Sequence, residues 1–266
     1  MPISEAIRVM KALMALLIAM LAACAPRPPV EADGRIERLR LPGGVLAERE
    51  AGILRYRGPL TEDGLDALRT LARGRETGVL EIDSAGGEIV AGMEFGLWVH
   101  DLGLDVRVNR ACLSSCANYV FPAGRNKVIA PGAVVAWHGS ARQTGLLEEL
   151  HAAVERDIGR RALSAAQRAD ELARARRANE TYLTGAILKQ GAFFHRIGVD
   201  EYVTRIGNEA YGVRGFYYLS VEDMARFGIH RVSAPDDYPR MDPRALARRV
   251  GFPVTYLKLD PADTAR

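Results

Sequence analysis

The 266-residue sequence has few cysteines and few aromatic residues, and neither sign of charge is in large excess. Its 36 basic residues nearly balance its 33 acidic ones, so the formal charge is only +3, which argues against nucleic acid as a partner. The five histidines are not at metal-ligand spacing, and no metal or cofactor is expected. With 48% hydrophobic and 26% charged residues, the chain is typical of one globular domain with a full core.

The N-terminus carries an apolar run that is too short to span a membrane as a helix of roughly 20 residues. Residues 12–23 follow Arg8 and Lys11, as in a secretory signal peptide, and end in Leu-Ala-Ala before Cys24. This ending resembles the lipobox of bacterial lipoproteins. The resemblance implies a signal peptide over residues 1–23 and lipid on Cys24. It also implies a lipid anchor in the cell envelope, facing the periplasm, and Ala25 favours the outer membrane. An ordinary signal peptide and an uncleaved anchor are the alternatives.

Two further cysteines lie close together in the sequence. If Cys24 carries lipid, Cys112 and Cys116 are left in an oxidising compartment, where disulfides persist. A bridge between them would hold the turn that contains Ser114 and Ser115. Their spacing is near the upper limit of disulfide reach, so two small buried thiols are the alternative.

Apolar segments alternate between strand and helix patterns, which predicts an α/β fold with right-handed βαβ units and a parallel sheet. Thr61 is predicted to cap a helix that ends near Gly74, and a second helix is predicted over residues 88–102. Strands are predicted over residues 53–57, 78–82, 105–109, 127–130 and 133–137.

The remaining segments set the predicted domain limits. Residues 24–50 are interpreted as a tether and an N-terminal strand, and residues 51–233 as the α/β domain. Within the domain, residues 145–190 form a long, highly charged helical stretch. The proline-rich residues 234–266 are predicted to be a packed but irregular tail.

Three separated motifs contain the groups that a serine hydrolase needs. Gly86 and Gly87 follow a predicted strand and can present backbone N–H groups. Ser114 and Ser115 begin an apolar helical run, where the helix N-terminus favours developing negative charge. His138 follows a further strand and is a candidate base. Each motif alone is more typical of a turn, a helix cap or a packed histidine.

In their order and spacing, these motifs resemble the proteolytic subunit of Clp protease and, more loosely, signal peptide peptidases. Residues 82–93 resemble the family's strand and Gly-Gly turn, and residues 115–124 its nucleophile helix. Residues 131–138 resemble the segment before its catalytic histidine, residues 218–229 its last element, and residues 145–190 stand where the family has a handle helix. The resemblance implies the ClpP/crotonase fold, with stacked ββα units.

The resemblance also assigns roles to individual residues. It implies Ser115 as nucleophile and His138 as general base. The amides of Gly87 and Cys116, with Gly86 beside them, would form the oxyanion hole. Ser114 is the alternative nucleophile, but the distance in sequence to Gly124 favours Ser115.

One group of the family's triad is missing, because its aspartate position holds Phe216. Glu209 and Asp200 are the candidates to replace it, and loss of this carboxylate costs about 10⁴ in rate in a worked triad. Lys189 would serve a Ser-Lys mechanism, whereas Lys127 is expected to face solvent. These observations predict a serine hydrolase, most simply a peptidase that acts on a polypeptide.

Two other interpretations stay open at this point. The missing aspartate favours a degenerate module that binds or scaffolds a periplasmic protein. An acyl-thioester enzyme of the crotonase type is disfavoured, because coenzyme A is not expected outside the cytoplasm. The handle segment also leaves a homo-oligomer open.

Overall fold

The computed structural model of the chain describes residues 36–263, and these form a mixed α/β arrangement with a mostly parallel central sheet. The predicted fold class is therefore confirmed. The predicted signal peptide, Cys24 and the tether up to residue 35 lie outside the described residues.

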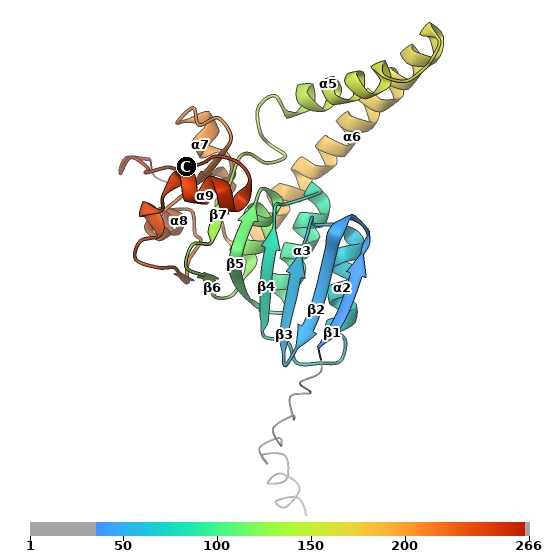
Figure 1. The fold of residues 1–266 in the computed structure, drawn as a ribbon. Helices are drawn as coiled ribbons and strands as arrows, with labels where there is room; N and C mark the ends of the chain where they lie inside the picture. The colour runs from blue at the N-terminus through green and yellow to red at the C-terminus, as the bar shows by residue number, and fades with distance from the viewer. Residues whose placement is uncertain (1–35, 264–266) are drawn as a thin grey trace, which may run out of the picture. The chain divides into compact units, whose positions relative to one another are not determined.

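The central sheet is built in the order β1-β2-β3-β4-β5-β6-β9, with β7 added beside β5 (Figure 1). The first three strands are antiparallel, and every later pair in this sheet is parallel. The strands are β1 (Glu37–Leu41), β2 (Val45–Glu50), β3 (Ile53–Arg57), β4 (Val79–Ser84), β5 (Asp105–Leu113), β6 (Lys127–Ile129), β7 (Val134–Ala136) and β9 (Val232–Ser233).

Two helices, α2 (Glu62–Ala72) and α3 (Ile89–Asp101), cover one face of this sheet (Figure 1). Helix α2 begins as predicted, because Thr61 Oγ1 accepts a hydrogen bond of 3.1 Å from the amide of Gly64. Its three leucines at helical spacing, Leu65, Leu68 and Leu71, are buried against the strands. Each contributes about 2 kcal/mol of hydrophobic free energy.

The helical stretch predicted over residues 145–190 is two helices, α5 (Leu146–Gly159) and α6 (Ala165–Ile197), which run side by side away from the sheet (Figure 1). They are separated because Ser164 caps α6: its Oγ accepts from the amide of Gln167, and the Gln167 side chain accepts from the amide of Ser164. The buried residues of α6 lie only between Leu183 and Phe194, so this last part of the helix joins the core.

The C-terminal residues, predicted to be a packed but irregular tail, include two regular elements. They contain α9 (Pro243–Val250) and β10 (Val254–Tyr256), and β10 pairs with β8 (Phe216–Tyr218) in a second, two-stranded sheet. The short helices η3 (Glu201–Thr204) and α7 (Ile206–Glu209) come before β8, and α8 (Val221–Arg226) and η4 (Tyr238–Arg240) lie between β8 and α9. The prolines that suggested irregular structure fall at helix starts and between elements, where their fixed φ is compatible with the fold.

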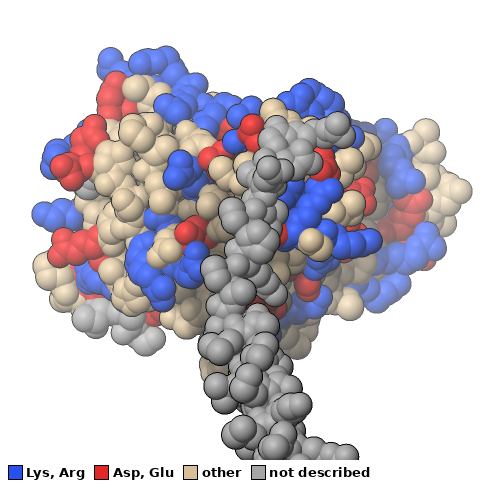
Figure 2. Space-filling view, turned by 90° about the horizontal axis from the view of Figure 1, so that it is seen from below, with Lys and Arg blue, Asp and Glu red and all other residues tan. Residues whose placement is uncertain are grey.

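Charged side chains of both signs are interspersed on the face shown in Figure 2. Ion pairs such as Arg125 with Asp105 and Arg196 with Asp101 combine opposite charges on the described surface. No helix within residues 36–263 is both long and apolar enough to cross a membrane.

Candidate active site

The three motifs meet where β4, β5 and β7 end, at the carboxyl edge of the parallel strands. The sheet register brings them together, because Ser84 at the end of β4 pairs with Cys112 of β5, and Leu113 of β5 pairs with Ala136 of β7. The Gly86-Gly87 turn, the serines and His138 each follow one of these strands directly. Ligand and catalytic sites collect at this edge of open α/β sheets.

Ser114 occupies a sharp turn between β5 and the helix that follows it. Its φ is +53°, in the left-handed region that a residue with a side chain rarely adopts. The turn is fixed on both sides, since the amide of Ser114 donates to the carbonyl of Ala136 at 3.1 Å and its carbonyl accepts from the amide of Asn118 at 2.8 Å. Such strained backbone persists only where its surroundings determine it, and it is common at active sites.

The hydroxyl that faces His138 is that of Ser114, whose Oγ lies 2.8 Å from His138 Nε2. The predicted pairing of Ser115 with His138 is not present. Ser115 is buried, with 3% of its surface exposed, and its Oγ donates to the carbonyl of Gly87 at 3.0 Å. The alternative serine therefore has the geometry expected of the nucleophile.

The serine assignment shifts by one residue because the helix after the turn is not a regular α-helix. Residues Cys116–Val120 form a π-helical turn, η2, and the amide of Phe121 bonds to the carbonyl of Cys116 five residues earlier. A π turn holds one residue more than an α turn. The distance from Ser114 to Gly124 is therefore one residue longer than the nucleophile-to-glycine distance of the resembled family. Counting back from Gly124 by that shorter distance reaches Ser115 instead of Ser114.

Two backbone amides beside Ser114 are available to a developing oxyanion. Within residues 36–263, no acceptor is found for the amides of Gly87 and Ser115. The Gly86-Gly87 turn packs closely against the two serines. A Cβ placed on Gly86 would lie only 3.0 Å from the amide nitrogen of Ser115 and 2.7 Å from Ser114 Cβ. Only glycine fits at position 86, where φ is +99°. Because Ser114 is the serine that faces His138, the amides of Gly87 and Ser115 are the candidate donor pair, whereas the sequence suggested Gly87 and Cys116.

Cys116 has a different place in the structure. It forms a disulfide with Cys112, and the two Cα atoms are 5.2 Å apart. Both cysteines are fully buried. Of the two alternatives left by the sequence, the structure has the bridge, and the bridge spans the turn that contains Ser114.

His138 is half-buried and lies against an aromatic ring instead of a carboxylate. The ring of Phe216, at the family's aspartate position, is 4.3 Å from the imidazole between centroids. Among the described residues, no carboxylate lies within hydrogen-bonding distance of His138. Burial lowers the pKa of His138 below its usual 6.5, and the more distant charge of Glu149 opposes this shift.

The residues proposed to replace the aspartate are engaged elsewhere. Glu209 pairs with Arg205 at 3.3 Å, and Asp200 caps η3 through a bond of 2.8 Å from the amide of Tyr202. Lys189 is exposed on α6. The structure therefore brings none of these three residues to His138.

The segment after His138 is tied to the body of the domain by hydrogen bonds and, at Arg142, by an ion pair of 3.0 Å with Glu201. The side-chain amide of Asn118 donates to the carbonyl of Gly139 at 2.8 Å. Gln190 of α6 is fully buried and bonds to both Ser140 and Ala141, at 3.1 and 3.2 Å. Its Oε1 also accepts from the hydroxyl of Tyr119 at 2.8 Å. Nothing in the sequence around Gln190 indicated this role.

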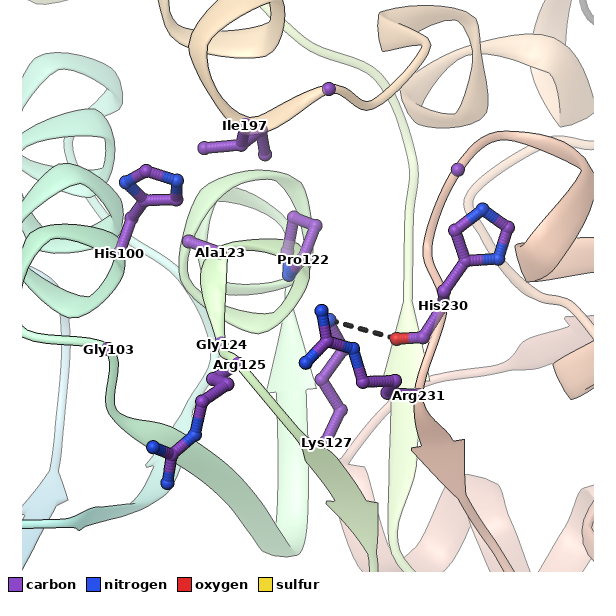
Figure 3. Close-up of a pocket in the computed structure, with 12 residues that line it drawn as sticks. His100, Gly103, Pro122, Ala123, Gly124, Arg125, Lys127, Ile197, His230 and Arg231 are labelled. Atoms are coloured by element: carbon purple, nitrogen blue, oxygen red, sulfur yellow. Dashed lines mark hydrogen bonds between the residues drawn. The ribbon is translucent and has the colours of Figure 1, made fainter.

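A separate cavity of about 360 Å³ lies at the other edge of the sheet and contains neither Ser114 nor His138 (Figure 3). Its lining includes Lys127, which is 95% buried instead of solvent-facing as predicted, and whose Nζ donates to the carbonyl of His230 at 3.0 Å. Burial and the charge of Arg231 lower the pKa of Lys127 to about 8. Helices α3, α6 and α8 end at or next to residues that line this cavity, and helix C-termini carry partial negative charge, which favours cations such as Lys127 nearby.

The described residues contain no group of three or more His, Cys, Asp or Glu side chains that could hold a metal ion. The groups that the structure brings together at the carboxyl edge are the hydroxyl of Ser114, the imidazole of His138 and the two backbone amides.

No protein-family model and no curated protein matches the sequence. Matching solved structures include an enoyl-CoA hydratase from Thermoplasma volcanium GSS1, with 12% identity and a TM-score of 0.29, covering 62% of this chain and 96% of that chain. A membrane-bound stomatin-specific protease has 12% identity and a TM-score of 0.31, covering 77% and 96%. A probable enoyl-CoA hydratase/isomerase from Mycobacterium abscessus has 14% identity and a TM-score of 0.27, covering 79% and 96%. At these identities and TM-scores, the similarities do not indicate an activity.

Proposed function

We propose that the protein is a serine hydrolase in which Ser114 is the nucleophile and His138 the general base. The observation that carries this proposal is the distance of 2.8 Å between Ser114 Oγ and His138 Nε2. It is supported by the two amides, of Gly87 and Ser115, that have no acceptor within residues 36–263. A nucleophile, a base and oxyanion donors in contact are the parts that acyl transfer requires.

The chemistry follows from these positions. With its proton on Nδ1, the imidazole accepts the hydroxyl proton of Ser114 through Nε2 while Oγ attacks the substrate's carbonyl carbon. The amides of Gly87 and Ser115 stabilise the oxyanion, and one such donor is worth about 10² to 10³ in rate. The imidazolium then gives its proton to the leaving group, and water attacks the acyl-enzyme in the same way. General base catalysis contributes about 10² to 10⁴.

A fluorophosphonate probe tests the proposal on the full chain. The wild-type protein should become labelled, and Ser114→Ala should abolish labelling. Ser115→Ala is the matched control and should keep labelling, because its side chain bonds to Gly87 while its amide remains in place. A folded wild-type protein that stays unlabelled would contradict the proposal. Labelling that survives Ser114→Ala and is lost in Ser115→Ala would restore Ser115 as the nucleophile.

A peptidase is the form of hydrolase that we propose, with a polypeptide as substrate. Its support is the resemblance of residues 82–93 to the Gly-Gly turn of Clp protease. Cleavage of a casein or peptide library by the wild type, and not by Ser114→Ala, tests it. Cleavage of ester substrates alone would reject the peptidase form and keep the hydrolase.

A binding or scaffolding module without activity is the second candidate. The observation that favours it is the ring of Phe216 at the position of the family's aspartate, 4.3 Å from His138. A base without a carboxylate partner is expected to be weaker. This candidate predicts no probe labelling of the folded wild type, which is the opposite outcome of the same experiment.

Attachment to the bacterial envelope through lipid on Cys24 is also part of the proposal. It is supported by Leu-Ala-Ala before Cys24 at the end of a short apolar run. The wild type should fractionate with membranes, and Cys24→Ser is the informative variant. This variant should leave the outer-membrane fraction, and its retention there would contradict the anchor.

A further inference from the structure

The base of the proposed site is connected to the C-terminal end of the chain through stacked rings. Phe216 lies against His138, with a centroid distance of 4.3 Å. Phe252 stacks on Phe216 with centroids 4.6 Å apart and an angle of 20° between the planes. Since Phe252 lies between α9 and β10, the last part of the chain reaches the imidazole through one intervening ring.

Backbone hydrogen bonds fix both rings of this stack in relation to His138. Trp137, the neighbour of His138, exchanges two backbone hydrogen bonds of 2.8 Å with Tyr217, the neighbour of Phe216. On its other side, β8 pairs in parallel with β10, where Val254 lies opposite Phe216. The stack therefore has little freedom to move away from the imidazole.

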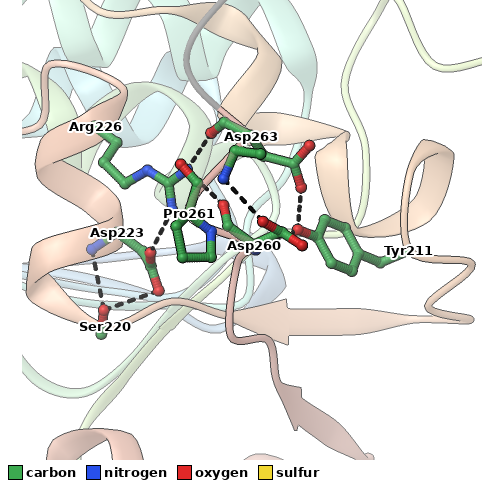
Figure 4. Close-up of polar contacts among 8 residues, drawn as sticks. Tyr211, Ser220, Asp223, Arg226, Asp260, Pro261 and Asp263 are labelled. Atoms are coloured by element: carbon green, nitrogen blue, oxygen red, sulfur yellow. Dashed lines mark hydrogen bonds and ion pairs between the residues drawn. The ribbon is translucent and has the colours of Figure 1, made fainter.

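The chain beyond β10 is also attached to the domain (Figure 4). The guanidinium of Arg226 on α8 donates to the carbonyl of Asp260 at 2.8 Å, and it is held by Asp223 at 3.1 Å. The hydroxyl of Tyr211 accepts from the amide of Asp260 at 2.7 Å and donates to the carboxylate of Asp263. These contacts attach residues 260–263 to α8 and to Tyr211, so the chain on the far side of β10 from Phe252 is also held.

We propose that Phe216 and Phe252 are positioning residues that hold the imidazole of His138 toward Ser114. Their stacking restricts rotation of the ring, and this replaces the orienting role that a carboxylate has in a triad. It also excludes water from one side of the imidazole, which keeps the base neutral. The proposal rests on the proposed hydrolase function, and it makes Phe252 a support of the active site although it lies 114 positions after His138 in the sequence.

The test combines probe kinetics with a titration that needs no activity. Phe252→Ala should lower the maximal rate of fluorophosphonate inactivation about 10- to 100-fold, with the probe's half-saturating concentration unchanged, because the base is misplaced and the binding surface is kept. In an NMR titration assigned with His138→Gln, the same variant should raise the pKa of His138 toward 6.5. Glu149 is the charged side chain acting on His138, so Glu149→Gln is measured alongside.

Tyr256→Ala is the matched control. Tyr256 lies on β10 and packs on Tyr218 with a centroid distance of 5.3 Å, so the variant also removes a C-terminal ring from β8. It should leave both the inactivation rate and the titration of His138 unchanged, because its ring does not contact Phe216 or His138.

The outcomes separate this proposal from the proposed function. If Phe252→Ala leaves both readouts as in the wild type, the positioning role is wrong, while labelling of Ser114 still supports the hydrolase. If the wild type does not label, the hydrolase is wrong, and the titration alone decides whether Phe252 acts on His138. Phe252→Leu keeps the apolar volume, and it gives the same comparison if Phe252→Ala fails to fold.

Discussion

The two partners of the Ser114–His138 pair are held by different kinds of interaction. Ser114 is fixed by covalent and backbone contacts: the disulfide between Cys112 and Cys116 spans it, and its own amide and carbonyl are both bonded. His138 is held by an aromatic contact with Phe216, and the residues that follow it are held by hydrogen bonds such as that from Asn118 to Gly139. The first arrangement fixes the backbone, whereas the second restricts a side chain.

Because of this difference, most of the electrostatic stabilisation comes from groups beside Ser114, and little from groups beside His138. The amides of Gly87 and Ser115 are dipoles fixed by the backbone, and they need no reorganisation when charge develops. On the other side, burial keeps the imidazole of His138 neutral, and no carboxylate within residues 36–263 bonds to it to stabilise the imidazolium. We therefore expect a site that stabilises the oxyanion well and has a weak base.

Replacing His138, the proposed base, should have the largest effect of the variants considered. His138→Gln should lower the rate of fluorophosphonate labelling about 10³-fold, since general base catalysis is worth 10² to 10⁴. Its melting temperature should stay close to that of the wild type, because the contacts of Ser114 remain. His195→Gln, at an exposed position of α6, is the control and should label normally. A His138→Gln protein that labels at the wild-type rate would exclude His138 as the base.

Loss of the hydrogen bonds of Gln190 should destabilise the attachment of the segment that follows His138, and not the turn at Ser114. Gln190→Leu leaves the hydroxyl of Tyr119, the side chain of Ser140 and the amide of Ala141 without their partner. We expect the free energy of unfolding to fall by about 3 kcal/mol, since buried polar groups without partners are costly. Urea denaturation measures this. Leu188→Ala, 71% exposed on the same helix, should change it by less than about 0.5 kcal/mol. Equal stability of the two variants would contradict the role of Gln190.

The disulfide tests the nucleophile side. Replacing Cys112 and Cys116 together with alanine should lower the free energy of unfolding by about 2 kcal/mol, the value for a loop of this length in the chain-entropy description. Reductant should destabilise the wild type and leave the double variant unaffected, which is the internal control. If reductant changes neither protein, the bridge is absent in solution, and the turn depends on its backbone contacts alone.

A carboxylate at position 216 should give His138 the electrostatic partner that it lacks, and so reduce the difference between the surroundings of His138 and those of Ser114. Burial lowers the pKa of His138, so labelling by the wild type should decline only as the pH falls below 6.5. Phe216→Asp removes the ring and adds a negative charge, both of which favour the imidazolium, so it should raise this pKa. The decline should then begin at a higher pH. Phe216→Asn is the uncharged control and should give a smaller shift. A decline that does not move between wild type and Phe216→Asp would show that the new carboxylate does not reach His138.

Much of the fold was predictable because its signals are local. The cap at Thr61 and the leucines of α2 gave that helix its limits within two residues. The strands β3 and β4 were predicted from short apolar runs bounded by turn residues. By contrast, β10 is three residues long and pairs with β8, which is distant in the sequence. The paired residues Val254 and Phe216 are 38 positions apart. Such a strand has no local signal.

The residue types of the site could be predicted from the sequence, but the choice between the two adjacent serines could not. Both serines, the Gly-Gly turn and His138 were identified because these residue types follow strands, and the structure brings them together. The choice between Ser114 and Ser115 depended on counting residues, and the π turn of η2 adds one residue that no sequence pattern showed. Phe252 and Gln190 were missed because packing between distant segments defines their roles.

The position of β10 after the turn at Ser114 has a consequence for biosynthesis. A chain is made from its N-terminus, and its parts begin to fold in that order. The residues around Ser114 and His138 are therefore made well before Phe252, whose ring stacks on Phe216. A chain that has not yet reached Phe252 would present Ser114 beside a His138 without this support, so we expect such a chain to be labelled by a fluorophosphonate more slowly than the longer chain.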